Sequence, residues 1–207
     1  SLRGNELVLE ERKLMKIAFS TNNIYQIERF SKKYKVKNFI FASSSAIYGD
    51  LRNQKLSEES GPLLPISTYG AMKLASEGII SAAKESFLKK IYIFRFPNVV
   101  GYPSTHGVIH DFIKRLKKNP INLNVLGNGK QKKVYMHVSD LIYIMNYVVK
   151  NSKQKISLFN LGPRDDGVTV KFISKQVVKY FPKNKKISFQ NKNKGWVGDV
   201  PLFRYST

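Results

Sequence analysis

NFIFASSSAIYG, residues 38–49, joins a short apolar run to a serine-rich turn. The run Asn38–Ala42 predicts a buried strand, and Ser44 falls just after its C-terminal end. Open α/β sheets place their ligands beyond the carboxyl ends of their strands. We therefore expect Ser44 to lie at a functional site.

Apolar runs alternate with amphipathic stretches along the rest of the chain, which is typical of an α/β protein with a mostly parallel sheet. In residues 67–90 the apolar side chains recur every three or four positions, which predicts a long helix. Further helices are predicted at 22–34, 107–118, 139–150 and 170–181. Further strands are predicted at 91–96, 122–126, 133–138, 156–160 and 187–190. After residue 96 loops, Pro and Gly interrupt this alternation, which indicates a sheet domain over 1–96 and a smaller region over 97–207.

The composition excludes several classes of protein. The chain has 207 residues, 42% of them hydrophobic, which is enough to build a core. It has no Cys, so disulfides, a thiolate nucleophile and a Cys-based zinc site are excluded. The longest apolar runs are far shorter than the roughly 20 residues of a membrane span, and no signal-peptide pattern opens the chain. We expect a cytoplasmic protein without a membrane partner.

The formal net charge of +22 admits two interpretations. It can support salt-sensitive binding of nucleic acid. It is also the charge of an ordinary lysine-rich surface, and we favour this interpretation because Lys far outnumbers Arg, the side chain preferred for base readout and bidentate phosphate contacts. Nucleic acid stays possible as a partner.

Tyr69 and Lys73 are four residues apart in the long predicted helix, so their side chains share one face. A phenol, with an ordinary pKa of about 10, acts as a base near neutral pH only if its anion is stabilised. A neighbouring ammonium does this. With the Ser44 hydroxyl opposite, the pair could move a proton to and from a bound substrate.

Three segments extend this pattern: FASSSAIYGD at 41–50, YGAMK at 69–73 and RFPNVVG at 95–101. Their order and spacing resemble the extended short-chain dehydrogenase/reductase family, and within it the NAD-dependent epimerase/dehydratases of nucleotide sugars, most of all UDP-glucose 4-epimerase. The resemblance runs from about residue 20 to about 202. It implies the C-terminal part of a Rossmann-type doubly wound parallel sheet with a smaller α/β substrate-binding region. By the same resemblance, residues 1–96 belong to the NAD-binding domain, and 97–207 mainly bind substrate, with some segments returning to the sheet.

The resemblance also implies a role for individual residues. Tyr69 matches the catalytic base, Lys73 the cation that lowers its pKa and holds the nicotinamide ribose of NAD, and Ser44 the hydroxyl that binds the reacting sugar oxygen. The remaining matched positions are a cofactor neighbour, Pro97, and the substrate-binding positions Ser45, Asn98, Val108, Val125, Leu126 and Lys133. The implied partners are a nucleotide sugar, with UDP-hexose favoured, and a second copy of the chain, since relatives pair through the helices matching 22–34 and 67–90.

Departures from the family pattern limit what it implies. Ser45 and Ala46 stand where related dehydratases and decarboxylases carry carboxylates, which disfavours those reactions. Lys133 and Trp196 stand where relatives have Arg, so the grip on the diphosphate and the identity of the nucleotide stay open.

No Gly-x-x-Gly-x-x-Gly or Gly-x-Gly-x-x-Gly turn, the element that cradles a dinucleotide pyrophosphate, occurs in the chain. We therefore expect the C-terminal two thirds of an epimerase-like enzyme, a fragment or a truncated gene product, inactive by itself. Two alternatives stay open: another oxidoreductase or epimerase of nucleotide sugars, and an inactive basic binding protein on a truncated dehydrogenase scaffold.

Overall fold

The computed structural model describes residues 29–51, 54–182, 185–193, 195 and 204–206. Its strands are β1 (Asn38–Ser44), β2 (Lys55–Leu56), β3 (Lys90–Phe96), β4 (Asn98–Val100), β5 (Asn122–Val125), β6 (Lys132–Lys133), β7 (Tyr135–His137), β8 (Ile156–Asn160), β9 (Val168–Thr169), β10 (Lys186–Phe189) and β11 (Arg204–Tyr205). Its helices are η1 (Ser45–Tyr48, a 3₁₀ turn), α3 (Thr68–Ala83), α4 (Val108–Lys118), α5 (Val138–Asn151) and α6 (Val170–Lys179). The expected α/β class with parallel strands is confirmed.

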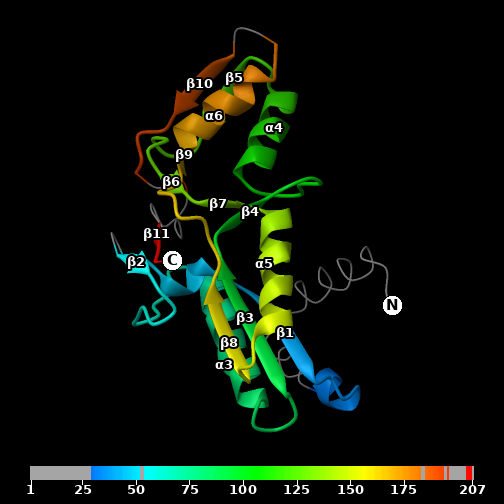
Figure 1. The fold of residues 1–207 in the computed structure, drawn as a ribbon. Helices are drawn as coiled ribbons and strands as arrows, with labels where there is room; N and C mark the ends of the chain where they lie inside the picture. Colours follow the sequence, from blue (N-terminus) through cyan, green and yellow to red (C-terminus); the bar gives the residue numbers. More distant parts are fainter. Residues whose placement is uncertain (1–28, 52–53, 183–184, 194, 196–203, 207) are drawn as a thin grey trace.

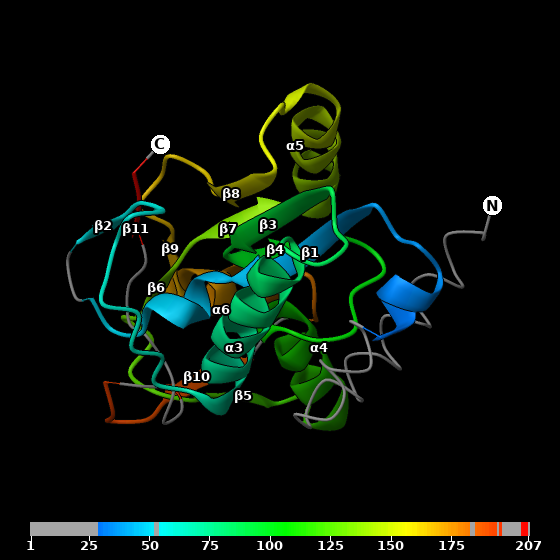
Figure 2. The ribbon, with the colours of Figure 1, turned by 90° about the horizontal axis from the view of Figure 1, so that it is seen from below.

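A three-stranded parallel sheet in the order β1-β3-β8 organises one end of the molecule. Helix α3 covers one face and α5 the other, as Figures 1 and 2 show. The run Ile91–Arg95 in the central strand is buried throughout, because helices lie on both faces. Strand β8 comes from the C-terminal half of the chain, so that half contributes to the sheet.

Each face of the sheet has its own apolar core. Towards α3, Ile91 and Ile93 of β3 pack with Ile80 and Ala83 of the helix. Towards α5, the intervening residues of β3, Tyr92 and Phe94, pack with Leu141 and Met136 among others. This alternation is the two-residue period of a strand with helices on both sides.

A smaller α/β unit lies at the other end of the molecule, at the top of Figure 1. Strands β5 and β10 pair in parallel, and α4 and α6 pack against them. The core of this unit contains Phe112 and Leu116 from α4, Leu123 and Val125 from β5, and Ile173 from α6. The β4–β7 pair runs between the two ends.

The predicted helix over 67–90 is wrong at its C-terminal end, since α3 stops at Ala83. The N–H groups of Lys84, Glu85 and Ser86 bond to carbonyls three residues back, which is the tighter 3₁₀ pattern common at helix ends. The Ser86 hydroxyl also donates to the Ala83 carbonyl, an alternative to regular helical bonding. Leu88 still reaches the core, which is why the apolar periodicity ran past the end of the helix.

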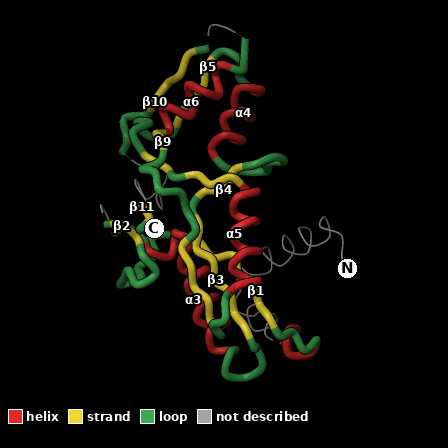
Figure 3. Tube along the Cα trace, viewed as in Figure 1, coloured by secondary structure: helices red, strands yellow, loops and turns green. Residues whose placement is uncertain are grey.

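The predicted strand over 133–138 is two short strands. β6 pairs with β9, and β7 pairs with β4, so the chain changes partner at the buried Val134. Figure 3 shows short strand segments in this region, between the smaller unit and the three-stranded sheet. Of the predicted helix 22–34, residues 29–33 are helical and the part before residue 29 lies outside the described residues.

Candidate functional site

The start of α3 brings Tyr69 to the carboxyl end of β1. The Ser67 hydroxyl accepts a hydrogen bond from the Gly70 N–H at 3.1 Å and so caps the helix. Gly70 lies directly against the backbone of Ala46 in η1, where a larger side chain would collide. This close approach sets the first turn of α3 against the end of β1.

Ser44 is the last residue of β1, which runs two residues past the predicted end at Ala42, and it is also the N-cap of η1. Its backbone is extended, and its Oγ accepts a hydrogen bond from the Ala46 N–H at 3.2 Å. Its side chain also hydrogen-bonds Tyr69. The structure therefore brings two of the three predicted catalytic residues into contact.

Lys73 lies one turn further along α3, between the helix and β1. Its Nζ donates to the Ala42 carbonyl oxygen at 2.7 Å and lies 4.8 Å from the ring centroid of Phe41 and 5.8 Å from that of Tyr69. All three predicted catalytic side chains are thus gathered at the carboxyl end of β1, where α/β sheets bind ligands.

The pKa of Tyr69 does not follow the sequence-based expectation. Burial raises it above the ordinary value for tyrosine, and the hydrogen bond with Ser44 opposes this only in part. The pKa of Tyr69 is therefore raised, whereas a lowered pKa was expected beside Lys73. The ammonium of Lys73 lies over the ring face and is hydrogen-bonded to the main chain of β1.

Asn98 and Lys133, two of the predicted substrate residues, lie on neighbouring strands. Asn98 is exposed at the start of β4, and its Nδ2 donates to the Val134 carbonyl oxygen at 3.1 Å. Val134 directly follows Lys133, which is half-buried at the end of β6. The structure brings this amide and this ammonium to one part of the surface.

Some of the other predicted ligand-binding residues reach the surface, and some are buried. Leu126 is 43% exposed and Val108 is half-buried at the start of α4, so both side chains reach the surface. Val125 is only 1% exposed and belongs to the core of the smaller unit. Pro97 and Ser45 are buried as well. Trp196 lies outside the described residues.

Four residues beside the site were not singled out from the sequence: Ser43, Tyr48, Glu77 and Arg95. All four are buried. Glu77 continues the four-residue spacing of Tyr69 and Lys73 along α3, and Arg95 interrupts the apolar run of β3. Two features of the sequence could have identified this pair. Arg95 is a charged residue inside an apolar strand, and Glu77 is a carboxylate on the same helix face as Tyr69 and Lys73.

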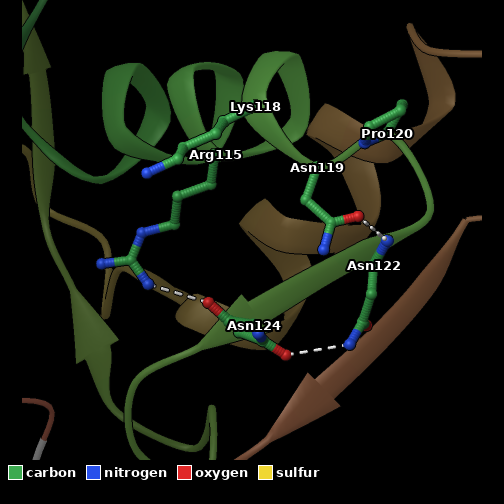
Figure 4. A pocket seen from close by; sticks show the side chains of 6 residues that line it. All are labelled: Arg115, Lys118, Asn119, Pro120, Asn122 and Asn124. Carbon is green, nitrogen blue, oxygen red and sulfur yellow. Dashed lines mark hydrogen bonds between the residues drawn. The ribbon is translucent and has the colours of Figure 1, made fainter.

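A cavity of about 560 Å³ lies at the far end of α4 and contains none of the predicted site residues. Figure 4 shows Arg115 reaching Asn124, whose carbonyl oxygen accepts from Nη1 at 2.8 Å. The Asn119 side chain accepts from the N–H groups of Ile121 and Asn122. These bonds tie the end of α4 to β5, so the cavity residues have a structural role.

The residues that the structure describes contain neither a metal-binding cluster nor a membrane-spanning helix. Within those residues, no three His, Asp or Glu side chains are grouped as metal ligands would be. Among the same residues, no helix has the length and apolar character needed to span a membrane.

Comparison with known proteins finds relatives that match most of this chain. A family model described as NAD dependent epimerase/dehydratase matches residues 20–162. An uncharacterised UDP-glucose epimerase of Bacillus subtilis is 29% identical over 161 residues, which are 75% of this chain and 50% of the relative. A putative UDP-glucose 4-epimerase of Methanocaldococcus jannaschii is 31% identical over 147 residues, 69% of this chain and 46% of the relative. The chain thus spans about half the length of the curated relatives it matches.

Solved structures give the same result. A UDP-galactose 4-epimerase superposes with a TM-score of 0.74 at 29% identity, covering 89% of this chain and 59% of that one. The Thermus thermophilus UDP-glucose 4-epimerase in complex with NAD superposes with a TM-score of 0.69 at 26% identity, covering 87% of this chain and 60% of that one. The expected Rossmann-type fold and the expected family are both confirmed.

Proposed function

Since the chain belongs to the NAD dependent epimerase/dehydratase family, we propose that it acts as an NAD-dependent epimerase on a nucleotide sugar, a UDP-hexose inverted at C4. The observation that carries this proposal is the gathering of Ser44, Tyr69 and Lys73 at the carboxyl end of β1. Ser45 and Ala46 provide no carboxylate beside Ser44, which favours epimerisation over dehydration.

Ser44 and Tyr69 handle the proton of the sugar hydroxyl. Ser44 already hydrogen-bonds Tyr69, so a sugar oxygen that enters between them can contact both hydroxyls. Tyr69 takes the proton from the 4-hydroxyl and later returns it. Because burial raises the pKa of Tyr69, its phenol must first lose its own proton to solvent before the phenolate can accept one from the sugar, and a neighbouring positive charge favours that loss. The Lys73 ammonium supplies this charge when its Nζ moves from the Ala42 carbonyl towards the Tyr69 oxygen.

NAD, when bound, supplies the acceptor and donor of the hydride at the sugar carbon. We expect Tyr69, Lys73 and Pro97 to hold its nicotinamide end, since Tyr69 and Lys73 lie on α3 beside the carboxyl end of β1 and Pro97 directly follows β3. The chain has no Gly-rich pyrophosphate turn. We therefore expect residues 1–207 alone to bind NAD weakly and to show no turnover.

The diphosphate of the substrate would contact Asn98 and Lys133. Lys133 offers a positive charge without the planar fork of Arg, so it attracts the diphosphate but does not clamp two oxygens in parallel. Val108 and Leu126 present apolar surface to the nucleoside. A homodimer and a cytoplasmic location stay predictions from the sequence.

A fusion enzyme tests the proposal. The N-terminal part of the Thermus thermophilus enzyme that this chain does not match is joined to residues 20–207, and interconversion of UDP-glucose and UDP-galactose is followed. We expect turnover that Tyr69→Phe lowers by about 10²-fold or more, because general acid–base groups contribute on that order. Tyr143→Phe, which alters a 73% exposed tyrosine on α5, is the matched control. Equal turnover in the two variants would refute the role of Tyr69.

Binding by the chain itself gives a second test that needs no turnover. Titration calorimetry with UDP-glucose should show saturable binding that Asn98→Ala and Lys133→Ala each weaken. Unchanged affinity in both variants would refute the proposed diphosphate site.

A further inference from the structure

A buried ion pair joins helix α3 to β3, the central strand of the sheet. Arg95 on β3 and Glu77 on α3 are 4% and 5% exposed. The Arg95 Nε donates to Glu77 Oε1 at 3.1 Å and Oε2 at 3.2 Å, and Nη2 donates to Oε2 at 2.7 Å. Burial alone would lower the pKa of Arg95, but the hydrogen bonds and charge of Glu77 more than offset it. The Arg95 guanidinium is therefore charged where it meets the Glu77 carboxyl group.

Two further elements are tied to this pair. The Ser43 hydroxyl on β1 donates to Glu77 Oε1, and the Arg95 Nη1 donates to the Tyr48 hydroxyl in η1 at 2.9 Å. That hydroxyl in turn lies 2.8 Å from Asn160 Oδ1 of β8. One polar cluster, consisting of Ser43, Tyr48, Glu77, Arg95 and Asn160, thus connects α3 to η1 and to all three strands of the sheet.

The polar cluster lies directly behind the candidate catalytic residues. Ser43 precedes Ser44 on β1, and it is the register partner of Arg95 on β3. Glu77 lies eight residues after Tyr69, with Lys73 between them on the same helix face, which is about 12 Å along the axis at 1.5 Å per residue. Any sliding of α3 along the sheet would move Tyr69 relative to Ser44 and break the bonds of Glu77 together.

The contact of Gly70 with Ala46 restrains the first turn of α3, but the apolar packing further along the helix restrains sliding less strictly. The contacts of Ile80 and Ala83 with the sheet are non-directional, so neighbouring helix positions differ little in hydrophobic energy. The bonds between a guanidinium and a carboxylate are directional, and a buried charge left without its partner is strongly unfavourable. The ion pair therefore favours a single position of α3.

We propose that Glu77 and Arg95 are positioning residues, which hold α3 at the place on the sheet where Tyr69 meets Ser44. The consequence for turnover rests on the proposed function. The consequence for the contact between Ser44 and Tyr69 does not, so it is measured on residues 1–207 without substrate or cofactor.

The test compares the effect of Ser44→Ala on Tyr69 in two backgrounds. Tyrosines are labelled with ¹³C at Cζ, the Tyr69 resonance is identified by its loss in Tyr69→Phe, and its titration is followed upward from about pH 9, past the ordinary pKa of about 10, because burial raises the pKa of Tyr69. In the parent, Ser44→Ala should raise the pKa of Tyr69, because it removes the hydrogen bond that lowers it. In Glu77→Leu/Arg95→Met, the same Ser44→Ala change should have less than half of that effect.

The two apolar replacements keep the volume and remove both charges, so the protein should stay folded while the directional constraint is lost. Lys84→Met/Glu85→Gln, which removes an exposed ion pair at the end of the same helix, is the control and should leave the Ser44→Ala effect unchanged. If the double replacement does not fold, Arg95→Lys, which keeps the charge but not the fork, should reduce the effect in the same direction.

An undiminished Ser44→Ala effect in Glu77→Leu/Arg95→Met, or in Arg95→Lys where that variant is used, would overturn the proposal. So would the absence of any Ser44→Ala effect in the parent, because there would then be no contact to hold in place. Loss of the effect together with an inactive fusion enzyme would support the positioning role and refute the proposed function alone.

Discussion

Replacing Glu77 with leucine should destabilise the protein by about 3–5 kcal/mol, the usual cost of removing one partner of a buried ion pair. The side chains of Arg95 and Glu77 are 5% and 7% exposed, so water cannot take over the role of the lost carboxylate. The change removes three hydrogen-bond contacts from Arg95 and one from Ser43. Against a typical total stability of about 5–15 kcal/mol, a loss of this size is large.

Urea unfolding at pH 7, followed by far-ultraviolet circular dichroism, measures this cost. For a chain of this length 1 kcal/mol corresponds to about 2–4 °C, so the melting temperature should fall by roughly 6–20 °C. The second replacement, Arg95→Met, should recover most of the loss, because the guanidinium is then no longer buried without its partner. A residual cost of about 1 kcal/mol should remain, since the Ser43 hydroxyl has lost its acceptor.

Two results would refute this reasoning. One is a cost below about 1 kcal/mol for Glu77→Leu, which is the range of exposed ion pairs and would mean that the pair is solvated. The other is a double variant less stable than Glu77→Leu alone, which would mean that Arg95 contributes through contacts unrelated to Glu77. The slope of unfolding free energy against urea concentration should be the same in all variants. Equal slopes would show that the variants differ in stability and not in the surface exposed on unfolding.

Three further predictions concern other parts of the molecule. Gly49→Ala should cost more than about 1 kcal/mol in the same urea assay, because Gly49 has a φ of 68° and an added Cβ would collide with the Leu64 carbonyl; an unchanged midpoint would contradict this. Burial raises the pKa of Tyr48, Tyr69 and Tyr205, so above about pH 10 the unfolded chain loses these protons first and the free energy of unfolding falls as pH rises. Tyr205→Phe should make that fall less steep in urea titrations at increasing pH, and a fall of unchanged slope would count against the buried phenol. Binding to a duplex oligonucleotide, measured by fluorescence anisotropy, should weaken steeply with salt and vanish near physiological ionic strength; submicromolar affinity at about 150 mM salt would instead support a nucleic-acid-binding role.

Local features of the sequence predicted most of the elements. The predicted helix 107–118 is α4 at Val108–Lys118, and the predicted helix 139–150 is α5 at Val138–Asn151. Both succeed because the apolar period of a helix is set by residues three and four apart, which are close in the sequence. The predicted helix over 67–90 is wrong at its C-terminal end. Phe87 and Leu88 pack on the core after α3 has ended, so their spacing continues the apolar pattern of a helix without helical structure.

The candidate site, like the fold, could be predicted only in part from the sequence. The spacing of Tyr69 and Lys73, and the place of Ser44 at the end of an apolar run, were readable from the sequence. Val125 and Leu126 were both predicted to bind substrate, but Val125 ends β5 with its side chain packed against α4 and α6, whereas Leu126 follows the strand and is 43% exposed.

The sequence by itself determined the α/β class, the family and the candidate site residues, because these depend on short-range periodicity and on motifs within single segments. Only the tertiary structure decided that Glu77 and Arg95, 18 residues apart on a helix and a strand, meet as a buried pair behind Ser44. It also decided that the pKa of Tyr69 is raised. A buried ion pair and a desolvated phenol are properties of surfaces that pack together from different elements, and the free energy of removing those groups from water exists only once the elements have docked.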